Sequence, residues 1–137
     1  MKKSARQLVE EAQAQITTHP VARARELHGR ADVQFVDVRD VRELEREGVI
    51  PGAIHAPRGM IEFWFDPESP YFRPEFGQDK EYVLFCALGW RSALAAKTLQ
   101  DMGVPRVADI EGGFTAWKES GAPVAEKAAK KPKADAG

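Results

Sequence analysis

The sequence has little of several residue types and patterns that would by themselves suggest a function. It contains one cysteine, Cys86, so the chain has no internal disulfide and no zinc site built from several of its own thiolates. His19 and His28 have no metal-ligating partners in their segments. No apolar run approaches the roughly 18 residues that span a bilayer, and the N-terminal segment is too polar for a signal peptide. We therefore expect no metal, no organic cofactor, no membrane contact and a cytoplasmic location.

The chain also lacks an excess of charge of either sign. Its formal net charge is −1, with 43% hydrophobic and 30% charged residues. This balance gives no electrostatic reason to expect nucleic acid or an anionic membrane as a partner. A length of 137 residues suits one domain with a real hydrophobic core.

Strand-like and helix-like segments alternate along the chain. Residues 33–38, 82–85 and 107–110 are short runs rich in β-branched or aromatic residues, and a turn at 51–52 leads into a further short strand. Helical patterns precede and separate these strands, at residues 4–16, 21–28, 40–47, 92–102 and 114–120. The alternation predicts an α/β fold with a mostly parallel sheet and helices on both faces.

Three regions follow from this pattern. Residues 1–20 are expected to form an N-terminal helix that packs on the domain and is broken at 18–20, and residues 21–125 to form the domain. Residues 126–137 are rich in alanine and lysine and should be disordered.

Residues 58–80 are predicted to form a long irregular connection. Its aromatic cluster Phe63-Trp64-Phe65 is interpreted as satellite core, with a hydrophobic wall or partner-docking surface as the alternative.

The segment that carries chemistry begins where a buried strand ends at Cys86. Gly89 and Arg91 follow, and a helix opens at once. The carboxyl ends of parallel strands are where ligands bind, and a helix N-terminus presents unpaired N–H groups that stabilise a thiolate. Gly89 allows a positive φ, so that several amides can converge, and Arg91 adds a permanent charge that suits an oxyanion. The pattern predicts a nucleophile in an anion cradle.

Each of these residues also has a plainer interpretation. An isolated cysteine is most often a buried packing residue, but the strand–Cys–Gly–Arg–helix context favours the nucleophile. Asp37 and Arg39 are interpreted as structural, with Arg39 paired to a carboxylate and Asp37 bonded to nearby amides. His55 is expected to be a hydrogen-bonded packing residue, and Trp117 a core anchor.

Four motifs in register resemble the rhodanese-like family over about residues 30–124. The motifs are Asp37-Val38-Arg39, Gly48-x-Ile50-Pro51-Gly52-Ala53, Cys86-x-x-Gly89-x-Arg91-Ser92, and Glu111-Gly112-Gly113-Phe114-x-x-Trp117 with Gly121-x-Pro123. The resemblance implies a three-layer rhodanese-like domain. It also implies a sulfurtransferase in which Cys86 receives a sulfane sulfur as a persulfide and passes it to a thiol or cyanide-type acceptor.

The same resemblance implies roles for the loop. The backbone amides of Ala87, Leu88, Gly89, Trp90 and Arg91 would cradle the terminal sulfur, and Arg91 would orient an anionic donor, while Ser92 lies structurally near the site. Only four residues separate Cys86 from Arg91, and Phe85 precedes the cysteine. Related phosphatases and arsenate reductases have five intervening residues, which disfavours that activity.

The loop departs from the family pattern in its low basicity. Arg91 is its one basic residue, and Trp90 offers an apolar surface instead. We therefore expect thiosulfate to be a poor donor and an organic or protein persulfide to be preferred. The alternative is a rhodanese-fold module that relays sulfur or binds a partner without turnover.

Overall fold

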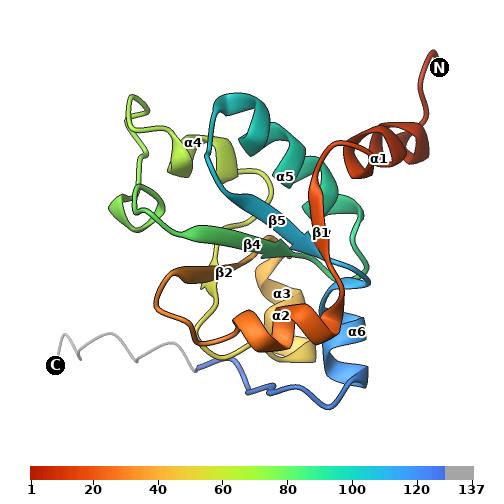
Figure 1. Cartoon of the computed structure of the whole chain (residues 1–137), viewed down its shortest axis with the longest axis vertical. Coiled ribbons are helices and arrows are strands. Elements are labelled where there is room, and N and C mark those ends of the chain that lie inside the picture. The colour runs from red at the N-terminus through yellow and green to blue at the C-terminus, as the bar shows by residue number, and fades with distance from the viewer. Residues whose placement is uncertain (129–137) are drawn as a thin grey trace, which may run out of the picture.

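The computed structural model describes residues 1–128, which form a five-stranded, all-parallel sheet (Figure 1). The strands are β1 (Thr17–His19), β2 (Val33–Asp37), β3 (Ile54–His55), β4 (Glu81–Phe85) and β5 (Val107–Ile110). Their order is β1-β5-β4-β2-β3, so β4 is the central strand. The predicted α/β class and parallel sheet are confirmed.

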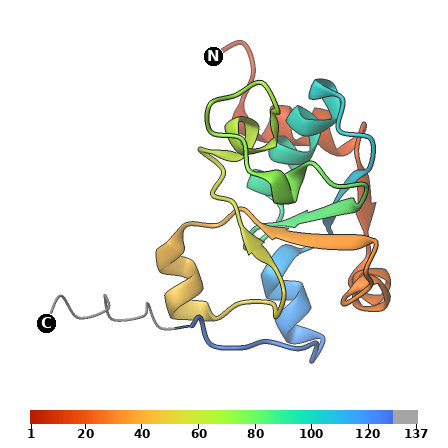
Figure 2. The same ribbon diagram turned by 90° about the vertical axis from the view of Figure 1, so that its left-hand side faces the viewer.

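Helices cover both faces of the sheet. They are α1 (Ala5–Gln13), α2 (Val21–Leu27), α3 (Val41–Glu47), α4 (Ile61–Phe65), α5 (Trp90–Met102) and α6 (Gly113–Glu119), with a 3-10 turn at Pro74–Phe76. Figure 2 shows α1, α4 and α5 on one side of the sheet and α2, α3 and α6 on the other. In the described part of the chain, no helix is both long and apolar enough to cross a membrane.

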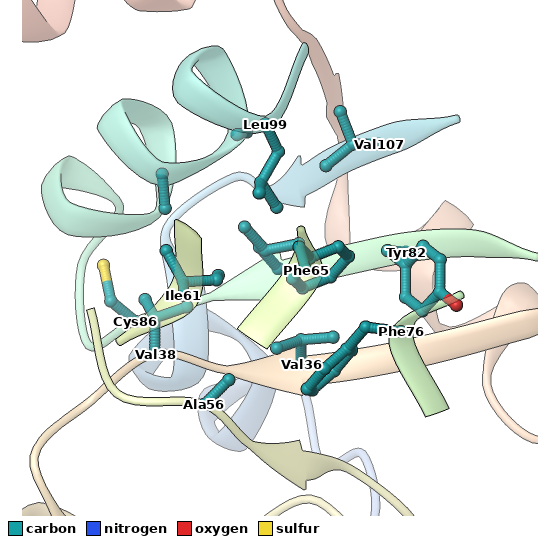
Figure 3. Packing of buried hydrophobic residues seen from close by; sticks show 13 residues of the cluster. Val36, Val38, Ala56, Ile61, Phe65, Phe76, Tyr82, Cys86, Leu99 and Val107 are labelled. Atoms are coloured by element: carbon teal, nitrogen blue, oxygen red, sulfur yellow. The ribbon is translucent and has the colours of Figure 1, made fainter. Parts of the chain in front are cut away.

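Successive side chains of each strand point to opposite faces of the sheet, so the core has two layers. Phe35 and Phe85 pack against α2 and α6, while Val36 and Leu84 face α4 and α5. Figure 3 shows the second layer, with Cys86 at its margin near Val38 and Ile61. The thiol therefore sits where the apolar core meets the carboxyl end of β4.

Two elements were not expected from the sequence. Residues 17–19, predicted only to end a helix, form the edge strand β1, which pairs with β5. Three residues are too short for an alternation pattern to reveal. The connection 58–80, predicted to be irregular, contains α4 and the 3-10 turn. Five residues rich in aromatics carry no helical periodicity, and α4 forms because Ile61 and Phe65 are buried in the core.

The two ends of the chain are tied to the domain differently. Helix α1 packs on α5 through Val9 and Ala12. Near the other end, Ala125 pairs with Val49 in an isolated antiparallel bridge. The predicted disordered tail lies for the most part in residues 129–137, which are outside the described residues.

Candidate active site

The loop after β4 holds the thiol in the position that the sequence predicted. Cys86 follows the last residue of β4, and α5 begins at Trp90. Gly89 immediately precedes α5 and has φ 123°, a backbone conformation that side chains disfavour. The site thus lies at the carboxyl end of the central strand and at a helix N-terminus, where ligands bind in parallel α/β sheets.

Two backbone amides converge on the sulfur. The N–H of Gly89 donates to Cys86 Sγ at 3.1 Å and that of Ser92 at 3.4 Å. Amide donors stabilise an anionic sulfur, since hydrogen bonds to an ionised acceptor are stronger than those to a neutral one. The side chain is only 1% exposed, so the loop encloses it. This geometry suits a thiolate shielded from bulk water.

A buried polar network extends from the sulfur to β1. The Ser92 hydroxyl lies 3.6 Å from Cys86 Sγ and 3.0 Å from Asp109 Oδ2, and Thr18 Oγ1 donates to Asp109 Oδ1 at 2.7 Å. Asp109 is 2% exposed, and burial raises the pKa of its carboxyl. Sequence reasoning missed Asp109 and Thr18. The available signal was a carboxylate inside the otherwise apolar strand Val107–Ile110.

Replacing Asp109 with asparagine should change how stability depends on pH. Because burial raises the pKa of Asp109 in the folded protein, folding favours its protonated form. Its contribution to stability is therefore full below the ordinary pKa of 3.8 and is lost as the pH rises through the folded value. Asp109→Asn should thus gain stability relative to the wild type between about pH 4 and about pH 7.

Urea unfolding at the two pH values measures this difference. Asp79→Asn, at a fully exposed carboxylate, is the matched control and should follow the wild type. If the free energy of unfolding changes equally with pH in Asp109→Asn and in the wild type, then the pKa of Asp109 is the same in the folded and unfolded states, which contradicts the prediction.

Arg91 lies in the first turn of α5, and its guanidinium is paired with a residue of another helix. Nη1 lies 2.6 Å from Glu43 Oε1 and Nη2 lies 3.0 Å from Oε2, a bidentate pair. The hydrogen bonds from Arg91 hold the pKa of Glu43 below its ordinary value, and Glu43 raises the pKa of Arg91. Both groups are therefore charged. Glu43, in the capping-box position three residues after Asp40, was not among the predicted site residues.

Asp37 and Arg39 form a buried ion pair with each other, whereas the sequence analysis paired Arg39 with an unspecified carboxylate and Asp37 with backbone amides. The Asp37 carboxylate accepts from Arg39 Nη2 at 2.8 Å and from the backbone N–H of Arg39 at 3.0 Å. The guanidinium also donates to Gly48 O at 2.8 Å and lies 4.0 Å above the Phe114 ring. The pair joins the end of β2 to α6, and within residues 1–128 neither side chain is hydrogen-bonded to Cys86 Sγ.

Gly113 brings α6 against the loop that carries Cys86. The N–H of Phe114 donates to Cys86 O at 2.8 Å, and that of Thr115 to Ala87 O at 3.1 Å. Gly113 has φ 60°, and a Cβ at this position would collide with Cys86 O and lie 2.7 Å from Ala87 O. Helix α6 thus holds the loop backbone in place, at a distance that leaves no room for a side chain at position 113.

Gly113→Ala should therefore destabilise the protein by about 2–3 kcal/mol, because it combines backbone strain with a backbone clash. Urea unfolding measures the effect. Gly29→Ala is the control: it has φ 86°, and a Cβ there would meet no described atom within 4 Å. This variant should cost about 1 kcal/mol. Equal costs for the two variants would contradict the role given to the close approach.

Apolar side chains of the loop face solvent. Leu88 is 70% exposed and Trp90 is 48% exposed. A hollow of about 370 Å³ lies beside the loop, lined by residues that include Glu43, Ala87, Leu88 and Phe114. A slightly larger hollow, about 390 Å³, lies at the opposite end of the sheet around the start of β4. Cys86 lines neither hollow, but only the first is lined by residues of the loop that follows it, Ala87 and Leu88.

The other residues singled out in the sequence are hydrogen-bonded or packed within the fold. His55 Nε2 lies 2.6 Å from Arg39 O, which confirms a hydrogen-bonded packing residue. Trp117 is fully buried, as expected of a core anchor. The aromatic cluster is divided, because Phe65 stacks in the core on Phe76 while Phe63 is 49% exposed. Within residues 1–128 there is no group of three or more His, Cys, Asp or Glu side chains arranged to hold a metal ion.

Comparison with known proteins agrees with this geometry. The family model for the rhodanese-like domain matches residues 21–120. A protein from Allochromatium vinosum named sulfurtransferase is 33% identical over 93 residues, which cover 68% of this chain and 78% of that protein.

Two solved structures extend the comparison. One, from Rhodopseudomonas palustris, described as a protein of unknown function and possible tyrosine phosphatase, is 52% identical with a TM-score of 0.88, covering 90% of this chain and 96% of that one. The other, the polysulfide-sulfur transferase homodimer of Wolinella succinogenes, is 29% identical with a TM-score of 0.70, covering 91% and 89%.

Proposed function

Because this chain belongs to the rhodanese-like domain family, we propose that it is a sulfurtransferase in which Cys86 carries sulfane sulfur as a persulfide. Relatives named as sulfurtransferases support a sulfur-transfer role. The observation that carries the proposal is the placement of Cys86 Sγ at the end of β4, where it accepts the amides of Gly89 and Ser92. A single thiol is compatible with the reducing cytoplasm.

The proposed reaction has two displacements. The Cys86 thiolate attacks the outer sulfur of the donor, a new S–S bond forms, and the donor's own bond to that sulfur breaks with its electron pair leaving on the donor. An acceptor, a thiolate or cyanide, then attacks the outer sulfur, and the electron pair returns to Cys86. The amides of Ala87 through Arg91 would hold the terminal sulfur, and the amides on Sγ favour the thiolate as leaving group.

Phosphoryl transfer is the less favoured alternative, although the relative from Rhodopseudomonas palustris is described in those terms. Four residues separate Cys86 from Arg91, which leaves a small loop for one sulfur atom. Arg91 is also paired to Glu43 by two hydrogen bonds, so a phosphate would have to displace a carboxylate. We expect no hydrolysis of aryl phosphates.

An organic or protein persulfide is the favoured donor, and thiosulfate a poor one. The cation that would orient a small dianion is already neutralised by Glu43, while Leu88 and Trp90 offer exposed apolar contact area. The same features are compatible with a relay module that is loaded but turns over slowly.

Sulfur transfer assayed with two donors distinguishes these functions. The protein is incubated with thiosulfate or with hydroxyethyl persulfide, and transfer to cyanide and to a thiol is followed over many turnovers. Faster turnover with the persulfide supports the proposal, and faster turnover with thiosulfate contradicts the donor preference. Loading without turnover identifies the relay, and no loading from either donor rejects both sulfur functions.

A further inference from the structure

The pair between Arg91 and Glu43 is held more firmly than an ordinary surface ion pair. Glu43 Oε1 also accepts the backbone N–H of Asp40 at 3.1 Å, completing a capping box at the start of α3. Its side chain is 20% exposed and that of Arg91 is 41% exposed. Because the carboxylate is fixed by the cap on one side and meets both guanidinium nitrogens on the other, little side-chain entropy remains to be lost on pairing.

The surroundings add no net positive charge. The hollow beside the loop is lined by three basic residues, Arg39, Arg46 and Lys118, and by three acidic residues, Glu43, Glu47 and Glu119. Arg39 is paired with Asp37 and Arg46 with Glu47. A dianion that approaches this side of the loop therefore meets no net attraction.

We propose that Glu43 is a specificity-determining residue, which cancels the charge of Arg91 and so discriminates against small dianionic sulfur donors in favour of singly charged organic persulfides. The inference rests on the proposed sulfur-transfer function. A carboxylate beside the guanidinium repels a dianion about twice as strongly as a monoanion at the same distance. The exposed side chain of Leu88 lines the same hollow and provides apolar contact for an organic donor.

Glu43→Gln tests whether the negative charge of Glu43 sets the donor preference, because it removes the charge and changes the shape of the side chain little. Glutamine can keep the capping box and can accept one hydrogen bond from Arg91, but it carries no charge. We expect the ratio of kcat/KM for thiosulfate to kcat/KM for hydroxyethyl persulfide to rise about tenfold. The thiosulfate reaction of the variant should also become sensitive to added salt, because a net positive charge now attracts the donor.

Two further variants serve as controls. Glu45→Gln makes the same charge change on an exposed position of α3 and should leave the ratio within about twofold of the wild type. Glu43→Asp keeps the charge, so thiosulfate should remain a poor donor even if glutamine at this position proves unstable. An unchanged ratio in Glu43→Gln, or an equal rise in Glu43→Asp, overturns the inference. Failure of wild-type Cys86 to load from either donor would instead reject the underlying function.

Discussion

Replacing Cys86 with serine should lower sulfur transfer by about a thousandfold or more, because the reaction depends on a thiolate that a hydroxyl cannot replace near neutral pH. Cys86 is the only thiol of the chain, so no neighbouring residue can take over the displacement. Transfer from hydroxyethyl persulfide to a thiol acceptor, measured under the same conditions for both proteins, gives the loss directly.

The fold should survive this substitution. The serine oxygen can accept the amides of Gly89 and Ser92 that Cys86 Sγ accepts in the wild type. We expect the free energy of unfolding to change by about 1 kcal/mol or less. A variant that is folded but inactive supports Cys86 as the nucleophile, whereas a folded variant that transfers sulfur at the wild-type rate contradicts it.

Replacing Arg39 with methionine should cost about 3–5 kcal/mol of folding free energy, because it leaves the Asp37 carboxylate buried without its counter-charge. Both side chains of this pair are almost completely buried, at 1% and 2% exposure. The substitution also removes the donor to Gly48 O and the cation above the Phe114 ring. Since Phe114 N donates to Cys86 O, the loop that carries Cys86 should loosen as well.

A surface pair provides the matched control for this prediction. Arg46 pairs with Glu47 at an exposed position, so Arg46→Met should change stability by about 1 kcal/mol or less. The double variant Asp37→Asn with Arg39→Met should be more stable than Arg39→Met alone, because no buried charge remains unpaired. If Arg39→Met costs no more than Arg46→Met in urea unfolding, the pair does not stabilise the end of β2.

The part of the site that was predicted from sequence is the part that lies on one continuous segment. Cys86, Gly89 and Ser92 come together because a strand, a tight loop and a helix follow directly on one another, so their order in the sequence is also their order in space. The buried strands were predicted for the same reason, since periodicity is a local signal.

Residues that reach the site by tertiary contact were missed. Glu43 meets Arg91 across 48 positions, and Thr18 meets Asp109 across 91. Neither pairing leaves a local pattern, because each depends on how α3 and β1 pack beside the central strands. The first contact shows that Arg91 is paired and is not a free cation. The second belongs to a network that places the buried Asp109 carboxylate two hydrogen bonds from the thiol, through Ser92.

The central claim is that Cys86 carries sulfur, and mass spectrometry tests it most directly. The protein is exposed to hydroxyethyl persulfide, its intact mass is measured, and the modified peptide is mapped before and after addition of a thiol acceptor. We predict one added sulfur atom, located on Cys86 and removed by the acceptor. No added sulfur, or sulfur that maps to a residue other than Cys86, would contradict the claim.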